Sequence, residues 1–384
     1  MSFFTDCTPH LSGERFTVFY RIIGDQQDAY AKAKDICLEQ TVEFPEDILP
    51  AGVIHEQIVG RIESFRPFDA NSWLAEITYA VETSAFELVQ LLNVIFGNVS
   101  LKPGIRVEHL ELGSLLHQFK GPRYGIRGLR HILQVPARPL LFTALKPMGL
   151  PTNELTKLAY QFALGGIDMI KDDHGLSDQP FSPYSERVKA CVNAVHEANS
   201  ITGKKSIYIP NITAPYGELH KRALIAKQAG AGGIMISPGL AGLEAMREIA
   251  EDDQIALPVI AHPAFLGSYV LADSGISHKV MFAEFARLAG ADVTIFPNFG
   301  GRFSFTRDQC ARIAHGSSAH MGDLRSIFPC PAGGMSLDNI PESLQLYGND
   351  VIFLIGGGLF KHGPDLVENS QHFLSIVESS YKQL

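Results

Sequence analysis

From about residue 140 to the end of the chain, short apolar segments rich in β-branched residues alternate with longer amphipathic segments. The segments of the first kind are predicted strands, at residues 140–147, 168–173, 206–214, 233–238, 257–264, 292–299, 326–334 and 351–358. Each intervening segment is long enough for a crossover helix, and one more helical segment follows the last strand. Eight consecutive strand–helix units predict an α/β fold, a (β/α)8 TIM barrel. A doubly wound open sheet is the alternative.

The first 120 residues have a different pattern, in which a strand and a helix are followed by two strands and a second helix. This order predicts an α+β domain of the ferredoxin-like kind. The chain of 384 residues also exceeds what one hydrophobic core usually organises. We therefore expect an N-terminal domain over 1–120, a bridge over 121–139 within a connecting segment that begins at Lys102, and a catalytic barrel over 140–384.

Charge and cysteine usage narrow the classes of partner and the compartment. The formal net charge of −9 opposes non-specific binding to nucleic acid or to anionic lipid. The five cysteines contain no CxxC pair, which favours reduced thiols; they are Cys7, Cys37, Cys191, Cys310 and Cys330. The sequence has no signal-peptide pattern and no apolar run of 18 residues. We expect a soluble cytoplasmic protein without a nucleic-acid or membrane partner.

The second predicted strand of the barrel ends in the sequence Lys171-Asp172-Asp173-His174. Active sites of TIM barrels lie at the carboxyl ends of the strands, so this cluster is placed where chemistry is expected. Alternation along a strand directs Lys171 and Asp173 to the same face, and His174 follows as the chain turns away. Oxygen and nitrogen groups at this spacing suit a hard divalent ion such as Mg²⁺. A solvated strand end with internal ion pairs is the alternative.

Four further polar side chains are predicted at the same rim. Lys146 ends the first strand and could transfer a proton or polarise a carbonyl, although it could also be an ordinary surface lysine. Asn211 and His262 end the third and fifth strands. Arg302 lies in a glycine-flanked loop after the sixth strand, where its guanidinium could bind a carboxylate or a phosphate.

Two glycine clusters follow the last two strands. Gly333 and Gly334 come after the seventh strand, and Gly356, Gly357 and Gly358 come after the eighth. Glycine lets a ligand approach the backbone N–H groups closely, and barrels often bind phosphate at these two loops. The paired clusters therefore predict a phosphate site.

Several motifs, in the same order and over nearly the whole chain, resemble those of the large subunit of RuBisCO. They are GPRYGIRGLR in the bridge, KP-x-GL on strand one, GGIDMIKDDH on strand two, AGGM on strand seven and GGG on strand eight. The resemblance implies that Lys171 is carbamylated by CO₂ and binds Mg²⁺ together with Asp173 and His174. It also implies that Glu39 and Asn98 match the family residues that reach into the partner subunit's barrel, so that a homodimer shares its active sites.

Departures from the carboxylase pattern indicate which branch of the family the chain resembles. The carboxylases have KPKLGL on strand one, whereas this chain has KPMGL, which retains Lys146 but lacks the second lysine, the proton-abstracting base. The metal motif KDDE becomes KDDH, and the strand-five His-Arg pair becomes His262-Pro263. The chain therefore resembles the RuBisCO-like proteins, which share the metal-bound enediolate chemistry but act on other phosphosugars.

Loss of one phosphate-site arginine, with Arg302 at the rim, fits a substrate that has one phosphate and one carboxylate. This favours decarboxylation, or transcarboxylation with hydrolysis, of a β-keto sugar acid such as 3-oxo-isoapionate 4-phosphate, with Lys146 polarising the carbonyl or protonating the carbanion. Two alternatives remain: an enolase or isomerase of a methylthio-sugar phosphate, and a non-catalytic phosphosugar-binding protein.

Overall fold

In the computed structural model, the described residues, 10–50 and 52–382, form two compact units. One unit contains the described residues up to Phe119 together with Gly267–Glu284 and Met321–Asp323. The other contains Lys120–Leu266, Phe285–His320 and the chain from Leu324 onward. Cys7 lies outside the described residues. No helix in the described part of the chain is both long and apolar enough to cross a bilayer.

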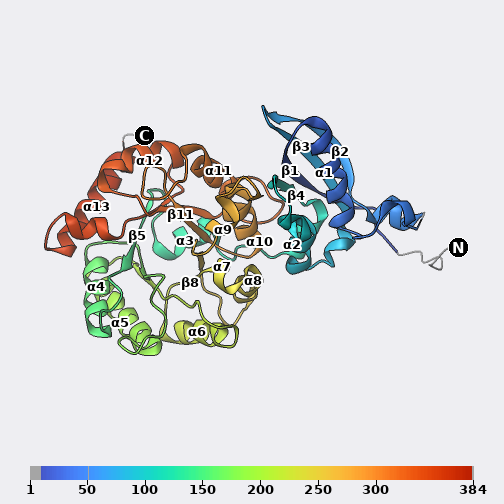
Figure 1. The fold of residues 1–384 in the computed structure, drawn as a ribbon. Coiled ribbons are helices and arrows are strands. Elements are labelled where there is room, and N and C mark those ends of the chain that lie inside the picture. Colours follow the sequence, from blue (N-terminus) through green and yellow to red (C-terminus); the bar gives the residue numbers. More distant parts are fainter. Residues whose placement is uncertain (1–9, 51, 383–384) are drawn as a thin grey trace. The chain divides into compact units, whose positions relative to one another are not determined.

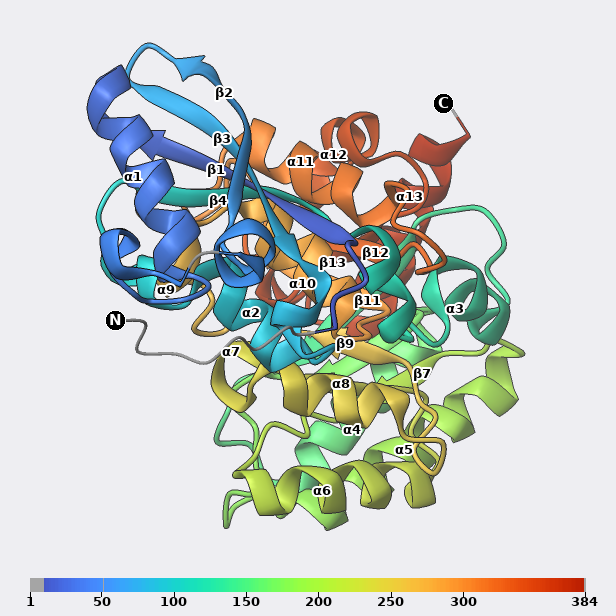
Figure 2. The same cartoon turned by 90° about the vertical axis from the view of Figure 1, so that its right-hand side faces the viewer.

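The first unit is built on a five-stranded sheet with the order β10-β4-β1-β3-β2. The strands β4, β1, β3 and β2 pair antiparallel with one another, and together with the helices α1 and α2 they have the chain order expected for a ferredoxin-like fold. Every second residue of β1 is buried, so one face of the sheet packs against the core, and Figure 2 shows α1 beside this sheet. The bounds are β1 Arg15–Ile23, α1 Gln26–Glu39, β2 Arg61–Asp69, β3 Ser72–Ala80, α2 Leu88–Phe96, β4 Ile105–Glu111 and β10 Gly275–Ile276.

Two strands of this sheet, β4 and β10, were not predicted from the sequence. β4 lies in the segment that begins at Lys102, which was expected only to connect the domains, and it pairs antiparallel with β1 through a register shift between Phe19 and Tyr20. β10 comes from the chain between two barrel strands and pairs in parallel with β4, with Gly275 opposite Arg106. The pairing partner of each strand is distant in sequence, so local periodicity alone did not reveal them.

The second unit contains the eight parallel strands that the sequence predicts. They form two four-stranded sheets, β13-β5-β6-β7 and β12-β11-β9-β8, and the Asn211–Met235 bridge joins β7 to β8. The last strand pairs with the first, with Ile352 opposite Leu140, which is the arrangement of a barrel and not of an open doubly wound sheet. The strands are β5 Leu140–Leu145, β6 Met169–Asp172, β7 Ile207–Ile209, β8 Ile234–Ile236, β9 Val259–Ala261, β11 Val293–Pro297, β12 Phe328–Ala332 and β13 Ile352–Leu354.

Helices surround the barrel strands, as Figure 1 shows. Their bounds are α4 Thr152–Leu164, α5 Tyr184–Thr202, α6 Tyr216–Ala229, α7 Pro238–Ala241, α8 Leu243–Glu251, α10 Phe285–Leu288, α11 Arg307–Ser318, α12 Ile340–Tyr347 and α13 Leu366–Tyr381; the short α9, Gly267–Val270, belongs to the first unit. One predicted crossover helix is irregular, because a π-helical turn at Val280–Glu284 precedes α10.

The residues predicted as a bridge form a helix that closes one end of the barrel. α3 spans Gly125–Leu133, and its Leu129 and Leu133 belong to the same buried cluster as Phe142 and Met169 of the strands. The first residue of the helix, Gly125, has a φ of +59°, and a Cβ atom there would lie 2.7 Å from the Ser326 carbonyl oxygen. α3 therefore covers the amino-terminal end of the strands, and the chemistry is left to the opposite end.

Candidate active site

The end of β6 sends successive side chains in opposite directions. Lys171 and Asp173 are buried near the mouth of the barrel, whereas Asp172 points to the other side and is completely buried. There the Asp172 carboxylate forms an ion pair with Arg187 of α5 at 3.2 Å and accepts a hydrogen bond from the Tyr208 hydroxyl at 2.5 Å. Asp172 therefore anchors the strand end to the helix layer, which leaves its two neighbours for the site.

Four of the predicted rim residues form one contiguous cluster. The Lys146 Nζ lies 2.9 Å from Oδ1 of Asp173, and the His174 Nδ1 lies 3.4 Å from the same oxygen. The rings of His174 and His262 are stacked, with centroids 4.9 Å apart and planes inclined by 8°. Side chains that follow β5, β6 and β9 therefore meet at the carboxyl end of the barrel, next to the buried Lys171.

Burial changes the protonation of Lys171. The Lys171 Nζ donates a hydrogen bond to the Asp172 carbonyl oxygen at 3.0 Å. Burial lowers the pKa of this amine to about 8, with Asp173 opposing the decrease and Lys146 adding to it. Lys171 is still mostly protonated at pH 7, but the neutral amine, which is the form that reacts with CO₂, is far more populated than in an ordinary lysine.

Two groups beside Lys171 also have shifted pKa values: Asp173 stays ionised and His262 stays neutral. Burial raises the pKa of Asp173, but the hydrogen bonds from His174 and Lys146 outweigh it, so the pKa lies well below the ordinary value and the group remains a carboxylate. Burial, followed by the positive charge of Lys171, keeps the pKa of His262 well below its usual value. The Ala264 N–H donates to the His262 Nδ1 at 3.2 Å, which assigns the imidazole proton to Nε2.

The side chains at the mouth could hold a divalent ion only with a ligand beyond the usual metal-binding residue types. The described residues contain no group of three or more His, Cys, Asp or Glu side chains that could hold a metal. Asp173 and His174 could supply two protein ligands, and Lys171 beside them would supply a third after its buried amine reacted with CO₂ to form a carbamate. With Asp173 and His174 this gives two oxygen ligands and one nitrogen ligand, which fits Mg²⁺ chemistry. In this structure the Lys146 ammonium pairs with Oδ1 of Asp173, the carboxylate that would bind the cation.

The two glycine clusters adjoin this group of side chains through close backbone packing. A Cβ atom at Gly301 would lie 2.6 Å from Cα of Gly334, so the loops after β11 and β12 touch through glycine alone. The Cβ position of Gly356 lies 3.8 Å from Cε of Lys146, and that of Gly358 lies 3.8 Å from the Met335 carbonyl oxygen. The loops after β12 and β13 therefore lie beside each other and beside Lys146, while Gly357 opens a 3₁₀ turn over Gly357–Lys361.

Arg302 lies in the exposed loop between β11 and α11, where its guanidinium stacks on the Phe303 ring at 5.0 Å. The Phe303 ring in turn lies where a Cβ atom of Gly333 would be, at 2.7 Å. The guanidinium is thus carried on the loop that packs against the first glycine cluster. Asn211 is buried, and its amide donates to the carbonyl oxygens of His174 and Leu176, so it fixes the loop after β6.

Glu39 and Asn98 lie in the first unit and form a pair of their own. The Asn98 Nδ2 donates to Oε1 of Glu39 at 3.0 Å, and Lys102 approaches the other carboxylate oxygen at 3.4 Å. This pair belongs to the first unit, whereas the Lys171 cluster belongs to the second. A role for the pair in a partner's barrel stays a prediction.

Two features of the site were not singled out from the sequence. The first is the Asp172–Arg187 anchor, for which the alternation along β6 was the available signal. The second is Met148 in the loop after β5, which is 54% exposed and whose methyl carbon lies 3.3 Å from the Cβ position of Gly175. The shortened KPMGL motif was the sequence signal for this residue. It lacks the second lysine of the carboxylase motif and has the apolar Met148 in this loop.

Known proteins similar to this chain come from one family. Residues 125–368 match the family model of the ribulose bisphosphate carboxylase large chain, catalytic domain. The chain is 37% identical to the ribulose bisphosphate carboxylase-like protein 1 of Rhodopseudomonas palustris, over 95% of this chain and 98% of the relative. It is 35% identical to a 5-methylthioribulose-1-phosphate isomerase of Rhodospirillum rubrum (95% and 96% covered) and 31% identical to a 2,3-diketo-5-methylthiopentyl-1-phosphate enolase of Geobacillus thermodenitrificans (94% and 91%).

A solved structure of a Rubisco-like protein from Rhodopseudomonas palustris superposes with a TM-score of 0.86 at 35% identity, covering 95% of this chain and 98% of that one. The barrel and the N-terminal sheet domain are those of the RuBisCO large-chain family, and the chain belongs to it. Within that family it is a RuBisCO-like protein.

Proposed function

We propose that the protein enolises a phosphorylated keto sugar of the methylthio type, as an enolase or an isomerase. The observation that carries this proposal is the gathering of Lys146, Lys171, Asp173 and His262 at one end of the barrel, next to the two glycine-rich loops. The printed names of two relatives, an isomerase and an enolase of such substrates, favour this reaction over the carbon–carbon cleavage that the sequence favours.

Enolisation removes a proton from the carbon next to a carbonyl and leaves negative charge on the carbonyl oxygen. The Lys146 ammonium and the Nε2–H of His262 are the donors suited to stabilise that oxygen. Lys171 as a carbamate, with Asp173 and His174, would hold Mg²⁺, which supplies Lewis-acid stabilisation of the enediolate when it is bound. The backbone N–H groups of the glycine clusters would bind the phosphate. The proton would pass to an oxygen of the Lys171 carbamate, and its return from there to a different carbon would complete an isomerisation.

The apolar surface at the mouth supports a substrate with an apolar end. Met148 places a thioether beside the Asp173 cluster, and its Sδ lies 3.9 Å from the amide nitrogen of Gln179. A flexible, polarisable side chain of this kind suits a methylthio group better than a second charged group.

Cleavage of a β-keto sugar acid such as 3-oxo-isoapionate 4-phosphate is the second candidate. The observation that favours it is the loop of Arg302, which packs on Gly333 and offers a guanidinium to a carboxylate beside the phosphate loop. We propose for either reaction a homodimer in which Glu39 and Asn98 complete the partner's site.

One experiment separates these candidates. The full chain is incubated with Mg²⁺ and bicarbonate, in separate reactions with 5-methylthioribulose 1-phosphate and with 3-oxo-isoapionate 4-phosphate, and the products are identified by NMR. Conversion of the first substrate without loss of carbon supports the proposal. Loss of the carboxylate from the second substrate alone would transfer the assignment to the second candidate, and no conversion of either would favour a phosphosugar-binding protein.

A further inference from the structure

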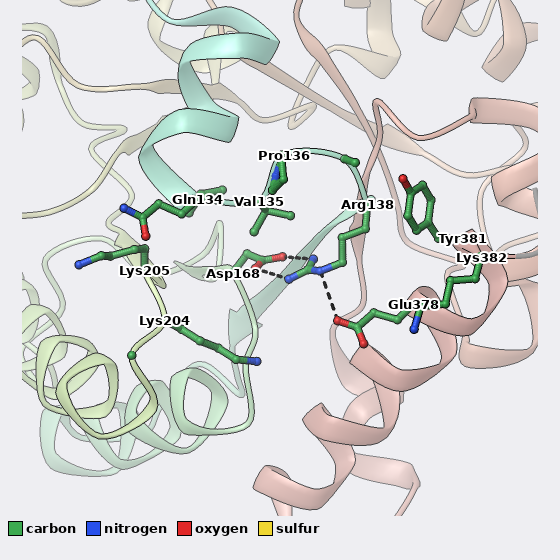
Figure 3. A pocket seen from close by; sticks show the side chains of 13 residues that line it. Gln134, Val135, Pro136, Arg138, Asp168, Lys204, Lys205, Glu378, Tyr381 and Lys382 are labelled. Atoms are coloured by element: carbon green, nitrogen blue, oxygen red, sulfur yellow. Dashed lines mark hydrogen bonds and ion pairs between the residues drawn. The ribbon is translucent and has the colours of Figure 1, made fainter.

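A cavity lies at the opposite end of the barrel from the Lys171 cluster. It has a volume of about 500 Å³, and Figure 3 shows the side chains around it. Arg138, Asp168 and Lys204 stand just before β5, β6 and β7, so the cavity opens at the amino-terminal ends of these strands. Side chains of α13 form another wall. A volume of this size falls in the range of small-molecule sites, roughly 300 to 1,000 Å³.

The acidic groups around the cavity are paired with an arginine, whereas the lysines are not paired with them. The Arg138 guanidinium makes two hydrogen bonds to Asp168, at 2.8 and 2.9 Å, and its Nε lies 3.8 Å from Glu378. Both carboxylates of the cavity are therefore engaged by one arginine. Three lysines are left to line the remaining space: Lys204, Lys205 and Lys382.

Lys204 is held in the cavity without a counter-ion. A Cβ atom at Gly166 would collide with the Lys204 ammonium, so the glycine there makes room for it. Within the part of the chain that the structure describes, this ammonium makes no hydrogen bond or ion pair, although it is half-buried. Burial lowers the pKa of Lys204, with Asp168 opposing the decrease and Arg138 adding to it. An anion beside Lys204 would relieve this unfavourable environment.

The geometry of the donors selects among anions. A planar carboxylate is best bound by the fork of an arginine, but the fork of Arg138 is already occupied by Asp168. Ammonium groups are compact point charges that suit the tetrahedral oxygens of a phosphate. The cavity also has an apolar wall, formed by Val135, Pro136 and the ring of Tyr381, which a bare inorganic anion would leave uncovered.

We propose that this cavity binds a small phosphomonoester, with its phosphate on Lys204 and its organic part on the apolar wall. The site is separate from the barrel mouth, and the proposal does not depend on the proposed reaction.

The test uses isothermal titration calorimetry on the full chain at low ionic strength, with phenyl phosphate as the probe. The Lys204→Gln variant should weaken one binding component at least tenfold. The matched control is Lys221→Gln, because Lys221 is an exposed lysine of the same unit that pairs with Glu218 and does not line the cavity; it should bind as the wild type does. Circular dichroism verifies that each variant is folded.

Two comparisons make the result decisive. Benzoate has a similar ring with a carboxylate, and inorganic phosphate has no organic part, so both should bind to this component more weakly than phenyl phosphate. The proposal is overturned if wild type and Lys204→Gln give the same isotherms, since any binding would then belong to the barrel mouth. It is also overturned if benzoate binds as tightly as phenyl phosphate, because the site would then not select phosphate.

Discussion

The reactivity of Lys171 toward CO₂ should depend on pH in a way that an ordinary lysine would not show. The ordinary pKa of 10.5 leaves about 0.03% of a lysine neutral at pH 7, whereas a pKa of about 8 leaves about 9% neutral. At fixed dissolved CO₂, we therefore expect Lys171 to react about 300-fold faster at pH 7 than an unperturbed lysine. The rate should rise about tenfold per pH unit well below pH 8 and level off above it.

The assay measures the initial rate of ¹³CO₂ incorporation, trapped by alkylation and located by mass spectrometry on the Lys171 peptide. Lys171→Arg is the control without a reactive amine. Lys146→Met should shift the profile to higher pH, because it removes a neighbouring positive charge that lowers the pKa of Lys171. A rate that keeps rising tenfold per unit above pH 9 would show that burial does not perturb this amine, and the reasoning would be wrong.

Three further predictions concern the surroundings of this lysine. Arg187→Met leaves a fully buried carboxylate unpaired and should reduce the free energy of unfolding in urea by about 3 to 5 kcal/mol, whereas Arg312→Met, at an exposed ion pair, should cost about 1 kcal/mol or less; equal effects would refute the anchor. His174→Glu should tighten Mg²⁺ binding in calorimetry, because a carboxylate replaces a neutral ligand, and an unchanged affinity would mean that His174 does not touch the metal. Gly334→Ala should lower kcat/KM severalfold, because its methyl group would push the loop after β12 away from Gly301. The control Gly217→Ala has open space around the new methyl group and should keep full activity. A fully active Gly334→Ala would show that the close packing of these two loops does not matter for catalysis.

The barrel was predictable because its strands are buried on both faces and appear as continuous apolar runs. β5, for example, is buried at every position. The N-terminal sheet was harder, since β4 and β10 depend on partners that are distant in sequence. The bridge was expected only as a connection, yet its apolar stripe of Leu129 and Leu133 closes the barrel. A local pattern identifies an element, but it does not identify the surface against which that element packs.

The residues of the candidate site could also be selected from the sequence, whereas the contacts among them could not. The rule that strand ends carry the chemistry, together with alternation along β6, was sufficient to select Lys171 and Asp173. The Lys146–Asp173 ion pair and the stacking of His174 on His262 join different loops, and loop conformation cannot be obtained from residue spacing. The physical state of Lys171 also needed the structure, because its pKa depends on how completely the barrel encloses it.

We propose that the barrel mouth enolises a phosphorylated keto sugar through the cluster around Lys171. Solvent-exchange NMR in ²H₂O tests it most directly, with 5-methylthioribulose 1-phosphate, Mg²⁺ and bicarbonate. We expect deuterium to enter the carbon next to the carbonyl with the wild type, and we expect Lys171→Ala to remain folded and to reduce this exchange at least 100-fold. Absence of exchange with the wild type, or equal exchange with Lys171→Ala, would contradict the account.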